Sequence, residues 1–218
     1  MIPLLHDFTD ATVLVFGGGP VGARKARRFA REARVLVVSP AFADRDFGGA
    51  ELIRTAPDPD DIAGWLERAV PALVVAATDD EEINEAVADA ARERGCLVNR
   101  ADRSGERDPD SVVVPATVRE EPVTVAVATG GTAPALSKYL RQELEETLDG
   151  AGEMARVCAG LREELKARDV PADRRRRVVT DVVNSPDLWT ALRTGTSNCP
   201  QVIEDVLGEQ PSTGSDQP

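Results

Sequence analysis

Three glycines have the spacing that lets a polypeptide backbone approach the phosphates of a dinucleotide. Gly17, Gly19 and Gly22 form a G-x-G-x-x-G pattern directly after the apolar run 13–16. In this pattern the first glycine permits a sharp turn, the second admits a pyrophosphate, and the third lets the next helix pack against the strand. The N–H groups and positive dipole end of that helix favour phosphate. The pattern predicts dinucleotide binding, with a purely structural turn as the alternative.

Residues after two other predicted strands complete this expected cofactor site. NAD-binding units commonly carry an acid after the second strand, but this chain has Ser39 there and its first acid is Asp44. No arginine directly follows that strand to hold a 2′-phosphate, so we expect NAD rather than NADP. Thr78 and Asp79 are expected at the nicotinamide-side ribose, with a helix cap as the alternative. The expected cofactor-binding residues are Gly17, Gly19, Pro20, Val21, Gly22, Ser39, Pro40, Ala41, Phe42, Thr78 and Asp79.

Short apolar segments alternate with amphipathic ones in the first half of the chain. Strands are predicted over residues 12–16, 34–38, 51–55, 72–77 and 96–99. Helices are predicted over 21–33, from 57 onward, and over 81–94. This alternation indicates an α/β fold with a Rossmann-like parallel sheet. The carboxyl edge of such a sheet collects the residues that follow its strands, and ligands bind there.

The pattern changes after residue 100. Two further strands are predicted over 111–115 and 122–128, followed by helices over 134–148, 153–168, 173–184, 186–194 and 200–207. We expect a Rossmann domain over 1–112, a small dimerisation and substrate segment over 113–150, an all-helical C-terminal region over 151–208 and a disordered tail over 209–218. Because residues 111–150 are too few for a core of their own, we expect a homodimer.

The composition of the chain argues against several classes of function. The net charge of −12 argues against a nucleic-acid partner. The chain has only three lysines, Lys25, Lys138 and Lys166, and its other basic residues are mostly arginines. This acidic, lysine-poor composition resembles that of halophilic proteins. Apolar runs are too short to span a membrane, and no signal peptide is evident, so we expect a cytoplasmic protein. The cysteines are widely spaced and His6 is the only histidine, so no metal site is expected.

Four segments, in this order, resemble the precorrin-2 dehydrogenase family, whose module also forms the N-terminal part of siroheme synthases. They are Gly17–Ala26 (GGGPVGARKA), Ala76–Asp80 (AATDD), Asn99–Asp102 (NRAD) and Thr129–Pro134 (TGGTAP). The resemblance implies NAD-linked oxidation of precorrin-2 to sirohydrochlorin by a homodimer, and in some members insertion of ferrous iron to give siroheme. The chain departs from the family in a longer loop over 102–115, in the valines at 112–114 where an aromatic residue is common, and in Thr129, which replaces a serine.

Asp102 is the candidate catalytic residue. It follows the fifth predicted strand at the carboxyl edge of the sheet, where a carboxylate can take the proton that is lost with the hydride. The family spacing favours this role over that of a turn-capping aspartate. Asp108 and Asp110 are rivals because the loop is lengthened.

Precorrin-2 carries many carboxylates, so an acidic protein needs local cations and N–H groups to bind it. Solvated surface charge is the alternative for each such cation. The expected substrate-binding residues are Arg100, Arg103, Arg119, Thr129, Gly130, Gly131, Thr132 and Lys138. Two other functions compete: a non-catalytic NAD(H)-sensing module, and a hydroxy-acid dehydrogenase, which would need a catalytic histidine within the fold.

Overall fold

The computed structural model describes residues 2–103 and 111–195. The chain divides into two compact units, one holding residues up to 114 together with 130–132, the other holding 115–129 and the chain from 133 onward. The expected helix over 200–207 and the expected tail over 209–218 lie outside the described residues. A further division near residue 150 stays a prediction.

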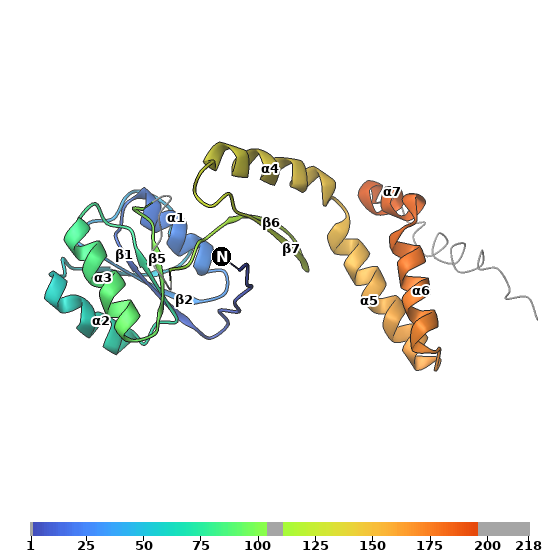
Figure 1. Ribbon diagram of the computed structural model, residues 1–218, viewed down its shortest axis with the longest axis horizontal. Coiled ribbons are helices and arrows are strands. Elements are labelled where there is room, and N and C mark those ends of the chain that lie inside the picture. The colour runs from blue at the N-terminus through green and yellow to red at the C-terminus, as the bar shows by residue number, and fades with distance from the viewer. Residues whose placement is uncertain (1, 104–110, 196–218) are drawn as a thin grey trace, which may run out of the picture. The chain divides into compact units, whose positions relative to one another are not determined.

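The first unit is built on a five-stranded parallel sheet (Figure 1). Its strands are β1 (Thr12–Phe16), β2 (Arg34–Ser39), β3 (Glu51–Arg54), β4 (Leu73–Ala76) and β5 (Leu97–Arg100). The order β3-β2-β1-β4-β5 places β2 on one side of β1 and β4 on the other. Open α/β sheets bind ligands where the strand order reverses in this way. The expected Rossmann-like fold is confirmed.

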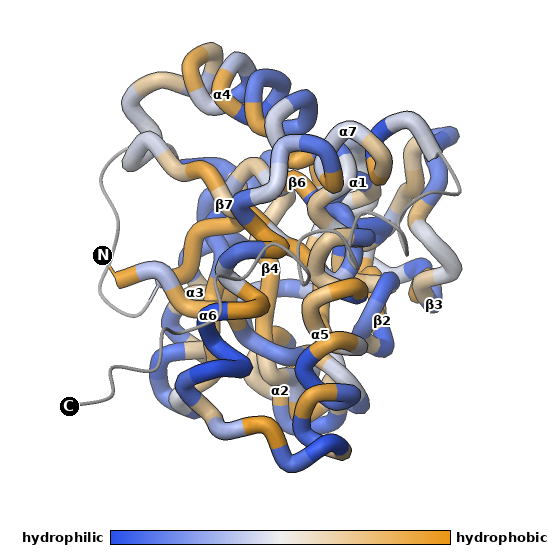
Figure 2. The backbone as a smooth tube through the Cα atoms, turned by 90° about the vertical axis from the view of Figure 1, so that its right-hand side faces the viewer, coloured by the Kyte–Doolittle hydropathy of each residue, from blue (hydrophilic) through white to orange (hydrophobic). Residues whose placement is uncertain are grey.

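Helices cover both faces of this sheet. Helix α1 (Pro20–Phe29) packs on one face, whereas α2 (Ile62–Ala69), preceded by the 3-10 turn η1 (Pro59–Asp61), and α3 (Glu81–Glu93) pack on the other. Alternate strand residues point to opposite faces, so Val15 packs with α1 and Leu14 with α2 and α3. Every residue of β4 is buried, which explains its apolar sequence (Figure 2).

As far as the structure describes it, the second unit consists of a hairpin and four helices. The hairpin strands are β6 (Ala116–Glu120) and β7 (Val123–Val127), and the helices are α4 (Pro134–Thr147), α5 (Ala151–Ala167), α6 (Ala172–Val183) and α7 (Pro186–Thr194). Helices α5, α6 and α7 share a core built on Met154, Leu161, Val178, Val182 and Leu188. The expected helical C-terminal region is thus confirmed as far as residue 195. Among the described helices, none has both the length and the apolar character needed to cross a membrane.

The strand expected over 111–115 was wrong. Ser111 makes only an isolated bridge with Val98, and the strand that pairs with β7 begins five residues later, at Ala116. Pro115 has no N–H to donate to a strand ladder, so pairing starts beyond it. The polar end of β6 concealed the strand, because Val118 is its only buried residue.

Candidate cofactor and catalytic site

The three glycines of the first turn have different surroundings. Gly17 has a φ of +114°, and a Cβ there would lie 2.3 Å from the carbonyl oxygen of Ala77. A Cβ on Gly22 would lie 1.9 Å from the carbonyl oxygen of Gly17, so the close approach of α1 requires glycine at 22. A Cβ on Gly19 would meet no atom within 4 Å. Packing therefore accounts for Gly17 and Gly22, whereas the space at Gly19 is open to another molecule.

That space belongs to a cleft of about 580 Å³. Its lining follows β1, β2 and β4 and consists of Gly17, Gly18, Gly19, Pro20, Val21, Ser39, Pro40, Ala41, Phe42, Ala43, Ala77, Thr78 and Asp79. Every expected cofactor-binding residue is included except Gly22, which packs against the carbonyl of Gly17. The open face of Gly19 and the N–H groups at the start of α1 fit the pyrophosphate of a dinucleotide.

Sequence reasoning missed three lining residues, Gly18, Ala43 and Ala77. The N–H of Ala43 donates to the carbonyl of Gly18 (2.8 Å), and a Cβ on Gly18 would lie 2.2 Å from the carbonyl oxygen of Ala41. The loop after β2 is therefore fastened against the glycine turn. The unbroken run of three glycines was the available signal, because the G-x-G-x-x-G pattern leaves the middle residue unspecified.

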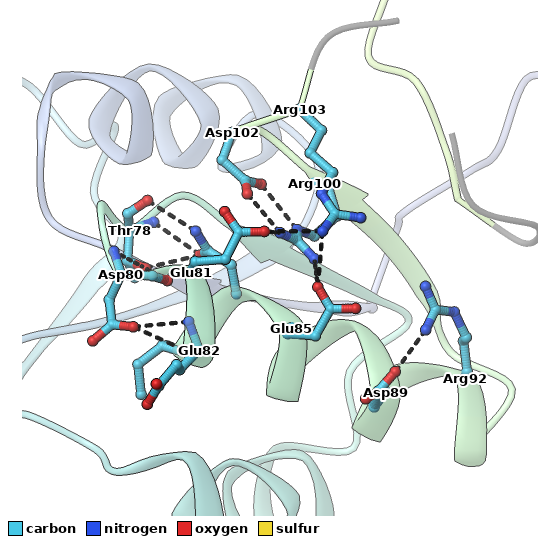
Figure 3. Close-up of polar contacts among 12 residues, drawn as sticks. Thr78, Asp80, Glu81, Glu82, Glu85, Asp89, Arg92, Arg100, Asp102 and Arg103 are labelled. Atoms are coloured by element: carbon cyan, nitrogen blue, oxygen red, sulfur yellow. Dashed lines mark hydrogen bonds and ion pairs between the residues drawn. The ribbon is translucent and has the colours of Figure 1, made fainter. Parts of the chain in front are cut away.

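Side-chain hydrogen bonds hold the turn after β4 (Figure 3). The Thr78 hydroxyl donates to Oδ1 of Asn84 (2.8 Å), and Nδ2 of Asn84 donates to the Thr78 carbonyl (3.0 Å). Asp80 caps α3 by accepting the N–H groups of Glu82 and Ile83. Thr78 thus shapes the start of α3 as well as lining the cleft. The anchoring Asn84 was missed, although a polar residue on the buried face of a predicted helix signals such a role.

Asp102 lies just beyond β5 and is held by a buried arginine (Figure 3). Arg100 donates from Nε to Oδ1 of Asp102 (2.9 Å) and from Nη2 to Oδ2 (2.6 Å). It also donates from Nη1 to Oε2 of Glu85 on α3 (2.9 Å). The side chain of Arg100 is 5% exposed and that of Asp102 is 18% exposed. Its Nη2 also lies 3.5 Å from Oε1 of Glu81, so the guanidinium of Arg100 is shared among three carboxylates of the protein itself.

A second arginine completes this charged cluster. Nη2 of Arg103 donates to Oε1 of Glu81 (2.9 Å) and to Oε2 of Glu85 (3.0 Å). The three carboxylates of the cluster exceed its two guanidinium groups by one negative charge. Unlike Arg100, Arg103 is partly exposed, at 39% of its side chain.

The cluster keeps Asp102 ionised. Burial acts to raise the pKa of Asp102, but the hydrogen bonds and charge of Arg100, together with the charge of Arg103, lower it below its ordinary value. The hydrogen bond from Arg100 is also the main reason why the pKa of Glu85 is lowered. Asp102 is therefore an anion at neutral pH, the form that can accept a proton.

Of the other expected substrate residues, Arg119, Thr129 and Lys138 belong to the second unit, whereas Gly130, Gly131 and Thr132 are grouped with the first. Nη1 of Arg119 lies 3.6 Å from Oε1 of Glu121, and the Thr129 hydroxyl shares a hydrogen bond with Ser137 (2.9 Å). Lys138 is exposed on α4. In the intervening loop, Gly130 and Gly131 have φ values of +64° and +84°, and Thr132 is exposed. The rival acids Asp108 and Asp110 lie outside the described residues.

Known proteins are similar in sequence to this chain over most of its length. A family model described as “Putative NAD(P)-binding” matches residues 4–116. A precorrin-2 dehydrogenase of Methanosarcina barkeri is 31% identical over 198 residues, which span 86% of this chain and 85% of that protein. The chain belongs to the precorrin-2 dehydrogenase family. Its first unit is accordingly an NAD(P)-binding domain, in agreement with the cleft described above.

Siroheme synthases contain the same family sequence within a longer protein. Siroheme synthase 1 of Pectobacterium atrosepticum is 34% identical over 183 residues, which span 80% of this chain and 36% of that protein. The siroheme synthase of Stutzerimonas stutzeri is 32% identical, with 94% of this chain and 44% of that protein covered. The chain therefore spans less than half the length of these two relatives.

The fold of this precorrin-2 dehydrogenase family member also matches a solved structure. The structure titled SirC, precorrin-2 dehydrogenase, superposes with a TM-score of 0.70 at 20% identity, covering 95% of this chain and 100% of that one.

Proposed function

We propose that this chain is an NAD-dependent precorrin-2 dehydrogenase that oxidises precorrin-2 to sirohydrochlorin. The main support for this proposal is a cleft that suits a dinucleotide and is open at Gly19. Asp102, which is ionised, follows β5 at the same edge of the sheet. Membership of the precorrin-2 dehydrogenase family supports this assignment of the substrate.

Different residues of the cleft bind different parts of the cofactor. NAD⁺ bound there supplies the acceptor for the hydride. Gly19 and the first N–H groups of α1 hold the pyrophosphate. The segment Ser39–Phe42 receives the adenosine half, and Thr78 and Asp79 receive the nicotinamide-side ribose.

Loss of the hydride is balanced by loss of a proton from the macrocycle. Asp102 accepts that proton, and Arg100 acts as a positioning residue that orients the carboxylate through two hydrogen bonds. A carboxylate with a lowered pKa is a weak base, so it suits a proton made acidic by departure of the hydride from the same molecule. This role replaces substrate binding by Arg100, whose guanidinium is occupied by Asp102 and Glu85.

Substrate carboxylates are bound by the more accessible groups. In the first unit, Arg103 supplies positive charge and the loop of Gly130, Gly131 and Thr132 supplies N–H groups. That Arg119, Thr129 and Lys138 of the second unit also bind substrate stays a prediction from the sequence. Ferrous iron is a second substrate in the family resemblance, and its insertion here stays a prediction. Among the described residues no group of three or more His, Cys, Asp or Glu side chains is arranged to hold a metal ion.

A homodimer is part of the proposal. None of the residues of α4 is buried within the described chain, and Leu136, Tyr139 and Leu140 on this helix are 48%, 55% and 36% exposed. Burial of these side chains against a second copy removes apolar surface from water. A cytoplasmic location and the absence of a nucleic-acid partner stay predictions from the sequence.

Anaerobic turnover at high salt tests the function. Precorrin-2 is generated in situ, NAD⁺ is added, and the sirohydrochlorin spectrum is followed for wild type, Asp102→Asn and Asp89→Asn. Asp89 is an exposed control that pairs with Arg92 on α3. We expect wild type and Asp89→Asn to form product, and Asp102→Asn to bind NADH normally but turn over at least about 100-fold more slowly.

Two other outcomes would contradict parts of this proposal. Undiminished product formation by Asp102→Asn would remove Asp102 from catalysis and direct attention to Asp108 and Asp110. NADH binding without product in wild type would favour the NAD(H)-sensing module.

A further inference from the structure

Arg54 borders the cleft although it comes from a strand that contributes no lining residue. It is the last residue of β3 and the register partner of Ser39 at the end of β2. Its Nη1 donates to the carbonyl oxygen of Pro40 (3.2 Å), and its guanidinium carbon lies 5.2 Å from the centroid of the Phe42 ring. An exposed positive charge therefore stands beside the part of the cleft that follows β2.

This part of the cleft has no acidic lining residue. The only acid in the described lining is Asp79, which follows β4. Asp44 and Asp46 come later in the loop after β2, outside the lining, and Asp46 accepts the N–H of Gly48. Within the described chain no carboxylate pairs with Arg54, so its charge is not neutralised by an ion pair.

The position that normally selects between the two nicotinamide dinucleotides is held by Ser39. An acid there binds the ribose hydroxyls of NAD and repels the 2′-phosphate of NADP. Ser39 instead donates its hydroxyl to the carbonyl oxygen of Ala41 (2.8 Å) and carries no charge. The electrostatic barrier to a 2′-phosphate is therefore missing at this residue.

We propose that this corner also accepts the 2′-phosphate of NADP(H), with Arg54 as the residue that binds it. The inference rests on the proposed function, because it uses the same cofactor cleft, and extends it to a second dinucleotide. A guanidinium suits phosphate because its N–H groups form parallel hydrogen bonds. Pro40 and the Phe42 ring hold the group in place, while Nε and Nη2 make no hydrogen bond within the described residues.

Binding measurements on the full chain test this specificity directly. Dissociation constants for NADH and NADPH are measured by nicotinamide fluorescence for wild type, Arg54→Gln and Arg34→Gln. Arg34 is the matched control, because it joins the same two strands at their opposite ends, 3.0 Å from Glu51. We expect wild type to bind both nucleotides within about threefold, and Arg54→Gln to lose about tenfold for NADPH alone. Arg34→Gln should change neither affinity.

The converse substitution sharpens the test. Ser39→Asp restores an acid after β2 and should weaken NADPH at least about tenfold while NADH still binds. NADH binding in wild type with NADPH more than about tenfold weaker would overturn the inference and leave the proposed function intact. Equal losses of both nucleotides in Arg54→Gln would overturn it as well. Failure of wild type to bind either nucleotide would refute the proposed function itself.

Discussion

The glycine turn allows ligand binding to be separated from packing by two single substitutions. Gly19 has an extended backbone (φ −72°, ψ −177°) that alanine adopts readily, and its Cβ position is open. Gly19→Ala should therefore keep the wild-type melting temperature but weaken NADH about tenfold or more, because the methyl group occupies the space of the pyrophosphate. Thermal unfolding and NADH fluorescence titration measure the two effects.

Gly22→Ala is the matched counterpart. Its Cβ would lie 1.9 Å from the carbonyl oxygen of Gly17, so α1 must shift. We expect a loss of about 1–3 kcal/mol in the free energy of unfolding. A destabilised Gly19→Ala that binds NADH normally would contradict the assignment of the cleft.

The cluster around Arg100 predicts a specific acid sensitivity. The pKa values of Asp102 and Glu85 are lowered in the folded protein. A lowered folded-state pKa contributes stability that is complete above the unfolded-state value, about 4, and is lost as the pH falls through the folded-state value. In Arg100→Gln the main cause of the lowering is removed, so the free energy of unfolding should fall less steeply between about pH 5 and pH 3.

Urea unfolding at a series of pH values measures this slope. The control is Arg34→Gln, which removes an exposed ion pair with Glu51 and should keep the wild-type slope. Identical slopes in Arg100→Gln and wild type would show that the buried pair has no influence on titration.

Single residues also show where sequence reasoning ends. The residues that line the cleft were predictable because they lie at or soon after the ends of β1, β2 and β4, which share one edge of the sheet, and their role in cofactor binding stays a prediction. Arg100 was expected to bind substrate, but burial and the approach of Glu85 from α3 engage it within the protein. Arg54 was overlooked because it reaches the end of β2 from the neighbouring strand. Both outcomes depend on contacts between segments, which adjacency along the chain does not reveal.

At the scale of elements, α5 begins in close contact with the β6–β7 turn. A Cβ on Gly152 would lie 2.5 Å from the carbonyl oxygen of Glu121 and 2.8 Å from that of Glu120. Nη2 of Arg156, one turn later, donates to the same Glu121 carbonyl (2.7 Å). The hairpin and the helix are therefore joined within the second unit by backbone proximity and a side-chain hydrogen bond.

Two glycines of α5 should respond to alanine with opposite signs. Gly152→Ala should destabilise the protein by about 1–3 kcal/mol, because its methyl group meets backbone carbonyls. Gly160→Ala, with no neighbouring atom within 4 Å of its Cβ, should stabilise it by about 0.5–1 kcal/mol through helix propensity. Urea unfolding followed by circular dichroism measures both, and equal changes would argue against the contact.

The burial of its side chains explains why strand β4 was predicted from the sequence more accurately than strand β6. Strand β4 was predicted to within one residue at each end because all its side chains are buried and apolar. Strand β6 was missed because only Val118 is buried and the rest of the segment has the composition of a loop. A strand whose partner lies a few residues away in a hairpin needs little apolar sequence to form.

At the scale of the whole molecule, the exposed apolar residues of α4 predict a dimer that one charged substitution on this helix would dissociate. Tyr139→Glu should convert a dimer to a monomer, because it places a carboxylate among Leu136 and Leu140. Glu145→Gln, at helical spacing on the opposite side of α4, should remain a dimer. Light scattering after size exclusion measures the mass, at high salt because a net charge of −12 per chain repels its copy. A monomeric wild type would refute the dimer.

The two units have cores without a common residue, and the chain's two tryptophans divide between them. Trp65 packs on the core of the first unit and Trp189 on that of the second. Each tryptophan is therefore an intrinsic optical probe of one half. In Trp189→Phe, fluorescence should follow the melting of the cofactor-binding half, and NADH should raise that midpoint. In Trp65→Phe the remaining signal reports the other half, so comparison of the two curves measures how strongly the halves are thermodynamically coupled.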